Sequence, residues 1–188
     1  MPARGEARGL SRQRSEANAA DATGNSVLKQ SKTKICKKRS KAKPPVRVQY
    51  GALPYRLDED ASVEVLLVTS RETKRWVIPK GWPIKGLKPS KAAAREAYEE
   101  AGVRGRIAGR AFGHYVYEKR LEDSVTTVPC QVEVFPLLVK RESKDWPESE
   151  QRTARWFPVA EAVALVDNDQ LHNLIQEFEK RKASSRQK

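Results

Sequence analysis

The chain has 188 residues and a formal net charge of +13, because 37 Lys and Arg outnumber 24 Asp and Glu. With 38% apolar and 32% charged residues, it holds enough hydrophobic material for one domain of ordinary size, and the rest is well solvated. No apolar stretch approaches the roughly 20 residues that span a bilayer, and no segment near the N-terminus resembles a secretory signal. We therefore expect neither a membrane-spanning segment nor a membrane partner.

The two cysteines, Cys36 and Cys130, lie far apart in the sequence, without the close spacing of metal ligands. This pattern supports neither a disulfide framework nor a zinc site. It is typical of a protein from a reducing compartment, and we predict a cytoplasmic location.

The positive charge is concentrated in residues 1–43, which hold twelve Lys and Arg but only three acidic residues. Large apolar side chains are too few here to offset an ordering cost of about 1 to 2 kcal/mol per residue, so we predict a disordered basic tail. Its charge suits an arm that binds nucleic acid or another polyanion. The alternatives are a solvated extension without a partner, including one from a misassigned start codon, and an organelle-targeting peptide.

Residues 44–183 have the pattern of one α/β domain. Apolar and polar residues alternate over 46–50, which is the period-two signal of a half-buried strand. Two further strands are expected at 62–70 and 75–79. A loop should follow over 80–90, where closely spaced Pro and Gly disfavour regular structure.

The clearest helix is predicted over 91–101, with Ser90 as its N-cap and Gly102 in the left-handed position after its last turn. The rest of the domain is predicted to form strands, loops and two C-terminal helices, the last with an apolar stripe. These expected elements are hairpin arms at 106–119 and 126–140 with a turn at 121–124, an acidic loop at 144–151, a strand at 154–157, a helix from Val159, and a helix that buries Leu171, Leu174, Ile175 and Phe178.

At about 100° per residue, the predicted helix brings Glu96, Glu99 and Glu100 within about 100° of arc. Like charges at these spacings destabilise a helix, and Arg95 offsets only part of the repulsion through its i,i+4 partner Glu99. A divalent cation would supply the missing positive charge, because magnesium is held by one or two carboxylates together with substrate phosphates. An acidic face that is merely solvated is the alternative.

Residues 81–103, GWPIKGLKPSKAAAREAYEEAGV, resemble the Nudix box, the sequence motif of the Nudix family. Chance agreement at this many spaced positions is on the order of one in twenty million per start position. One fixed position departs, because Leu87 stands where the family has its first Glu. We expect that change to affect a supporting or auxiliary-metal role, with reduced or lost hydrolysis as the alternative. The six matching positions are Gly81, Arg95, Glu96, Glu99, Glu100 and Gly102.

Within that family, the chain looks most like the diphosphoinositol polyphosphate and diadenosine polyphosphate hydrolases, through residues 64–71, 75–79, 92–103 and 144–157. The resemblance implies the Nudix fold, an α/β/α sandwich around a mixed β-sheet. It also implies divalent-metal-dependent hydrolysis of a pyrophosphate bond in a highly phosphorylated small molecule. The implied cofactor is Mg²⁺, with Mn²⁺ as an alternative.

The resemblance further implies roles for individual residues, because the chemistry needs a metal site, a base and a positioned water. These roles are metal binding by Glu96, Glu100 and a backbone carbonyl of Lys80 or Gly81, general base for Glu99, and orientation of the glutamates by Arg95 through charge-assisted hydrogen bonds. Glu148 and Glu150, in the later acidic loop, are alternatives to Glu99 as the base.

Phosphate recognition is expected from polar and basic side chains near the box. Ser70 and Arg71 lie at the end of the second predicted strand, and Lys80 places a cation beside the box glycine. Each remaining candidate has a solubilising surface residue as its alternative interpretation. These candidates are Arg47, Lys85, Lys88, Arg120 and Arg152.

The aromatic residues and one histidine are also informative. Trp82 lies in the proline-rich loop, where packing explains it less easily than it explains the other tryptophans, and stacking on a nucleobase is the alternative. The other tryptophans, Trp76, Trp146 and Trp156, are expected in the core. His114 is expected on a hairpin strand as a packing or substrate-edge residue.

Two classes of function remain open. The first is a hydrolase that acts on a diphosphoinositol polyphosphate or a dinucleoside polyphosphate, and the three glutamates favour it. An RNA 5′-end pyrophosphohydrolase would use the same chemistry on a nucleic acid. The second class is a catalytically weakened Nudix domain that binds nucleotide or RNA without turnover, with the basic tail as its partner surface.

Overall fold

The computed structural model describes residues 45–120 and 127–185, all within one compact unit that spans 42–188. Cys36 lies outside these residues, as do the predicted basic tail and the predicted hairpin turn at 121–124. Cys130 is buried, and its thiol is free. No helix in the described part of the chain is long and apolar enough to cross a membrane.

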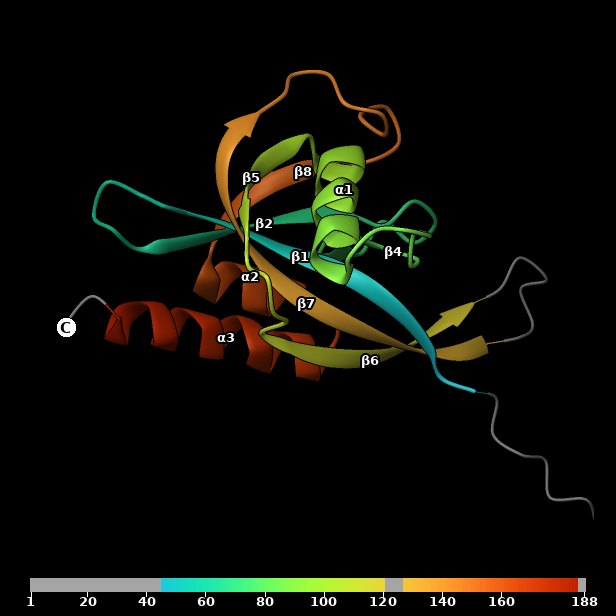
Figure 1. The fold of residues 1–188 in the computed structure, drawn as a ribbon. Coiled ribbons are helices and arrows are strands. Elements are labelled where there is room, and N and C mark those ends of the chain that lie inside the picture. The colour runs from blue at the N-terminus through green and yellow to red at the C-terminus, as the bar shows by residue number, and fades with distance from the viewer. Residues whose placement is uncertain (1–44, 121–126, 186–188) are drawn as a thin grey trace, which may run out of the picture. The chain divides into compact units, whose positions relative to one another are not determined.

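A mixed eight-stranded sheet forms the middle of the unit (Figure 1). Its centre is the parallel pair β1 (Arg47–Leu57) and β7 (Thr127–Glu142), and every other strand pair is antiparallel. The strand order is β3-β2-β1-β7-β5, with β4 on β1, β6 on β7 and β8 on β2. The other strands are β2 (Val63–Thr69), β3 (Trp76–Val77), β4 (Lys80–Gly81), β5 (Val103–Ile107), β6 (Gly113–Arg120) and β8 (Ala154–Pro158).

Helices cover both faces of this sheet. Helix α1 (Pro89–Ala101) lies on one face, and α2 (Val159–Leu165) and α3 (Asp169–Ser184) lie on the other (Figure 1). Each face has its own hydrophobic core. The predicted α/β/α sandwich around a mixed sheet is therefore confirmed.

The faces of α1 and α3 that pack against the sheet are those that the sequence pattern predicted. On α1 the small residues Ala93, Ala97 and Ala101 are buried in the core between the helix and the sheet, where short side chains permit close approach. On α3 the apolar stripe is buried in the opposite core, apart from Leu174, which is only partly buried. The side chains of Trp76, Trp146 and Trp156 are half-buried, so the prediction of three core tryptophans was too strong.

The structure corrects the predicted start of α1 and part of the loop before it. The helix begins at Pro89, because proline lacks the N–H that would stay unpaired in a first turn. Ser90 is therefore buried inside the first turn, and the N-cap is Lys88. Residues Lys80–Gly81 form a short strand on β1 instead of a loop. Gly102 adopts the predicted left-handed conformation, with φ 68°.

The hairpin arm predicted at 106–119 forms two strands instead of one. Strands β5 and β6 follow one another along the same edge of β7, with an interruption at 108–112. The break lies opposite Pro136, which has no N–H for a continuous ladder. Only its carbonyl is engaged there, by the Ala108 N–H at 2.8 Å.

Gly105 marks a second irregularity, and its substitution should destabilise the fold. A Cβ on Gly105 would lie 1.9 Å from the Leu138 backbone oxygen, beside a register shift between β5 and β7. Because backbone atoms cannot move aside cheaply, we expect Gly105→Ala to lower the free energy of unfolding by more than about 2 kcal/mol. Urea denaturation measures this, and Gly109→Ala, whose Cβ would meet open space, is the matched control. Equal stability of the two variants would contradict the close approach.

Candidate functional site

A cavity of about 950 Å³ lies where β4, α1, β6 and the segment before β8 meet. Most of the residues selected from the sequence line this cavity. They are Ser70, Arg71, Lys80, Gly81, Trp82, Arg95, Glu96, Glu99, Glu100, Arg120, Glu148 and Arg152. The selected residues that do not line it are Arg47, Lys85, Leu87, Lys88, His114 and Glu150.

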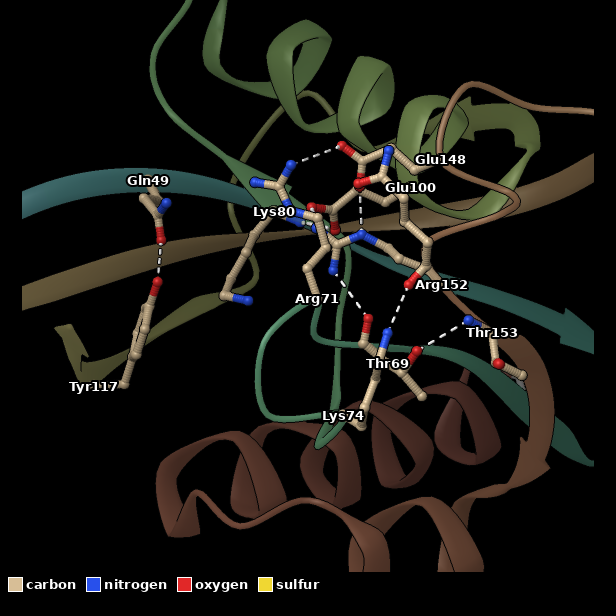
Figure 2. Close-up of polar contacts among 11 residues, drawn as sticks. Gln49, Thr69, Arg71, Lys74, Lys80, Glu100, Tyr117, Glu148, Arg152 and Thr153 are labelled. Atoms are coloured by element: carbon tan, nitrogen blue, oxygen red, sulfur yellow. Dashed lines mark hydrogen bonds and ion pairs between the residues drawn. The ribbon is translucent and has the colours of Figure 1, made fainter. Parts of the chain in front are cut away.

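Among the acidic residues that the structure describes, Glu100 is the most buried, with 5% of its surface exposed. Its Oε2 accepts a hydrogen bond from the Lys80 backbone N–H at 3.1 Å, and its Oε1 accepts one from the Arg152 guanidinium (Figure 2). Burial raises the pKa of Glu100, and the nearby charges of Lys80 and Arg152 oppose that rise. The last turn of α1 is thus joined to β4 through one carboxylate.

Glu96 lies one turn earlier on α1, against the backbone of Gly81. A Cβ on Gly81 would come within 2.1 Å of Glu96 Oε1, so only glycine leaves room for this carboxylate. Burial, and then the negative charges of Glu100, Glu99 and Glu148, raise the pKa of Glu96 to about 7. This excess of negative charge is what a bound cation would relieve.

Glu99 is more exposed than Glu100, with 32% of its side chain accessible. Arg95 Nε donates to Glu99 Oε1 at 2.6 Å, and the Arg95 side chain is 56% exposed. The backbone oxygen of Glu99 accepts from the Glu148 N–H at 3.1 Å. Arg95 therefore contacts one of the three glutamates, and the acidic loop is joined to the same turn of α1.

Arg152 and Glu148 form an ion-pair network next to Glu100. The Arg152 side chain is only 7% exposed, and it donates to Glu148 Oε2 at 2.5 Å and to the Thr69 backbone oxygen at 3.0 Å, as well as to Glu100. Glu148 in turn lies 3.7 Å from Arg71 Nη1. Arg71 is exposed at the cavity mouth, whereas Arg152 has the surroundings of an internal residue.

The opposite wall combines aromatic and basic side chains. Lys80 Nζ lies 5.4 Å from the centre of the Tyr117 ring, and the Tyr117 hydroxyl donates to Gln49 Oε1 at 2.6 Å (Figure 2). Burial is the main reason why the pKa of Lys80 falls to about 8, with the charge of Glu100 opposing it. Trp82 lies at the rim, with Arg47 Cζ and Lys119 Nζ at 5.0 and 5.3 Å from its ring centre. This wall supplies positive charge and aromatic surface.

Sequence reasoning missed Gln49, Tyr117 and Lys119. Gln49 is 3% exposed and Val46 is 55% exposed, so the predicted alternation over 46–50 had placed Gln49 on the wrong face of the strand. The hydrogen bond from Tyr117, however, depends on the register of β1, β7 and β6, which pairs Arg47 with Cys130 and Cys130 with Tyr117. The alternation within a single strand does not contain that register.

The residues present fit a divalent cation that has few protein ligands. Within the described residues, no three His, Cys, Asp or Glu side chains converge as a ligand group. Glu96 and Glu100 share one face of α1 beside the Lys80–Gly81 backbone, so two carboxylates and a carbonyl are at hand. Magnesium is commonly held by one or two carboxylates and completes its shell with water and substrate phosphates.

Comparison with known proteins identifies the family of this chain. A family model described as NUDIX domain matches residues 47–178. Nudix hydrolase 12, mitochondrial, of Arabidopsis thaliana is 35% identical over 148 residues, which cover 70% of this chain and 72% of that protein. Diphosphoinositol polyphosphate phosphohydrolase 3-alpha of Mus musculus is 38% identical over 106 residues, covering 55% of this chain and 60% of that protein.

Solved structures share the fold at low sequence identity. The C. elegans Ap4A hydrolase binary complex matches with a TM-score of 0.56 at 21% identity, over 74% of this chain and 99% of that chain. The NUDIX domain of Shewanella oneidensis NrtR, complexed with ADP ribose, matches with a TM-score of 0.54 at 14% identity, over 72% of this chain and 89% of that chain. The fold, the spacing of the glutamates and the family match together show that the chain belongs to the Nudix hydrolase family.

Proposed function

We propose that this Nudix hydrolase cleaves a pyrophosphate bond in a highly phosphorylated small molecule, of the diphosphoinositol polyphosphate or dinucleoside polyphosphate class. The observation that carries the proposal is the position of Glu96 and Glu100 beside the Lys80–Gly81 backbone, in a cavity large enough for a nucleotide-sized ligand. The name of the mouse relative supports the diphosphoinositol class.

The proposed cofactor is Mg²⁺, or Mn²⁺ as the alternative, held by Glu96, Glu100 and a backbone carbonyl of Lys80 or Gly81. When bound, such a cation neutralises charge on the phosphates and on the leaving group. Glu99 is the proposed general base, which takes a proton from the attacking water. Its hydrogen bond from Arg95 at 2.6 Å fixes the orientation of its carboxylate.

Glu148 is the alternative base, because it lines the same cavity. Its carboxylate has two arginine partners, Arg152 and Arg71, whereas Glu99 has one, Arg95, so we prefer Glu99 for this role. Glu150 lies outside the cavity and is not proposed for this role.

Substrate phosphates are proposed to contact Arg71 and Ser70 at one side of the cavity, and Lys80 and Arg120 at the other. The Ser70 hydroxyl interacts with the Thr73 hydroxyl at 2.7 Å and accepts from the Arg75 N–H at 3.1 Å, which holds this turn in shape. Two cationic sides would suit a substrate with phosphates beyond the scissile bond.

The test is release of phosphate or nucleotide by the purified full-length chain, with Mg²⁺ and with Mn²⁺. The substrates are diphosphoinositol polyphosphates, diadenosine polyphosphates, ADP-ribose, nucleoside triphosphates and 5′-triphosphorylated RNA. We expect turnover of at least one of the first two groups. Turnover of RNA alone would identify an RNA 5′-end pyrophosphohydrolase, and binding without any turnover would identify a binding module.

The departure from the Nudix box at Leu87 should have little effect on turnover. Leu87 is 41% exposed and does not line the cavity, so a carboxylate at this position would lie outside the cavity wall. We expect Leu87→Glu to change kcat/KM by less than about three-fold, as most surface substitutions do little. A large gain in turnover would instead show that the change to Leu87 removed a catalytic carboxylate.

The compartment remains a prediction. The cysteine usage favours a reducing environment such as the cytoplasm. Relatives in Arabidopsis thaliana, however, are named mitochondrial and chloroplastic. Fluorescence microscopy of the full-length chain, tagged at its C-terminus, would test the cytoplasmic location.

A further inference from the structure

Arg152 is buried beneath the proposed metal site and is committed to protein partners. Its guanidinium donates to Glu100 on α1, to Glu148 in the acidic loop and to the backbone oxygen of Thr69 at the end of β2 (Figure 2). A planar guanidinium can serve three acceptors in fixed directions, whereas a lysine ammonium is a point charge without that geometry. Arg152 therefore fastens three segments of the cavity wall to one another.

The two carboxylates of the proposed metal site are treated differently by the protein. Both oxygens of Glu100 have partners, namely the Arg152 guanidinium and the Lys80 backbone N–H. The Glu96 carboxylate accepts no hydrogen bond from the described residues, and it rests against Gly81. The protein thus supplies one carboxylate with its own cation and leaves the other available.

We infer that Arg152 is a positioning residue, which fixes Glu100 with its own positive charge and thereby weakens the binding of a divalent cation at Glu96 and Glu100. The inference rests on the proposed function, because it takes these carboxylates as the metal ligands. A fixed cation in contact with one ligand repels a second cation that approaches the same group. Arg152 therefore lowers the affinity for the metal ion, and at the same time it holds the Glu100 carboxylate in a single orientation.

The experiment compares full-length Arg152→Gln and Arg152→Lys with the unmodified chain. Binding of Mn²⁺ is measured without substrate, from the electron paramagnetic resonance signal of the free ion. Arg152→Gln removes the charge, so we expect Mn²⁺ to bind about ten-fold more tightly while kcat falls by about ten-fold or more. Arg152→Lys keeps the charge but not the planar fork, so its affinity should stay within about two-fold while kcat still falls.

Arg155→Gln is the matched control. Arg155 lies three positions after Arg152, is exposed on β8 and lies over the Phe157 ring. Its substitution should therefore change neither the Mn²⁺ affinity nor kcat. Circular dichroism in EDTA establishes that each variant is folded. If Arg152→Gln is unfolded, the lysine variant, which retains the buried charge, tests the positioning role through its kcat.

Unchanged or weaker Mn²⁺ binding by folded Arg152→Gln would overturn the inference, and so would full kcat in Arg152→Lys. Either result would make Arg152 a scaffold residue only. These outcomes differ from a failure of the proposed function. In that case the unmodified chain would bind no Mn²⁺, or Glu96→Gln would bind it equally well.

Discussion

Glu100→Gln is expected to reduce kcat by about 100-fold or more, since replacing even an outer-shell partner of a metal commonly costs 10- to 100-fold. The amide keeps the shape of the side chain but removes the negative charge that a cation needs. The fold should survive, because the Arg152 guanidinium retains Glu148 and the Thr69 carbonyl as acceptors. The measurements are steady-state kinetics with Mg²⁺ and Mn²⁺ binding, beside a thermal melt in EDTA.

Glu150→Gln is the matched control for this prediction. Glu150 is exposed and lies outside the cavity, so its substitution removes the same charge from the same domain without touching the site. We expect its kcat to stay within about two-fold, as for other surface changes. If Glu100→Gln and Glu150→Gln retained equal activity, the assignment of Glu100 to the metal site would be wrong.

The elements that the sequence predicted well are those with a strong local pattern. The alanines of α1 and the apolar stripe of α3 each specify one buried face, and Gly102 ends α1 in the left-handed conformation that glycine permits. The errors occur where distant segments decide the outcome. Lys80–Gly81 becomes a strand only because β1 offers a partner, and Pro136 on β7 interrupts an arm more than twenty residues earlier in the chain.

The same distinction applies to the site. The helical spacing of Glu96 and Glu100 already placed both carboxylates on one face. No local pattern indicated that Arg152, more than fifty positions later, would reach Glu100 from beneath. The sequence made Arg152 only one of several candidates for phosphate recognition, and its 7% exposure and its three acceptors distinguish it from Arg71 at the cavity mouth. Side-chain partners that come from separate segments are set by tertiary packing.

Gly81→Ala should inactivate the enzyme while leaving the fold intact. The added Cβ would lie within 2.1 Å of the Glu96 carboxylate, which must rotate away because the Gly81 backbone is held on β1. Since the displaced atoms are the end of a flexible side chain, the melting temperature should change little. We expect kcat/KM to fall by about 100-fold and Mn²⁺ binding to weaken in parallel.

The double variant Gly81→Ala with Glu96→Gln makes this prediction specific. If the alanine acts only by displacing Glu96, the double variant should be no less active than Glu96→Gln alone, because residues that act as a unit are not additive. Gly109→Ala, at a glycine with open space around it, controls for the change of residue type. Additive losses in the double variant would show that Gly81 acts through a partner other than Glu96, and would remove the main steric reason for glycine at the start of the box.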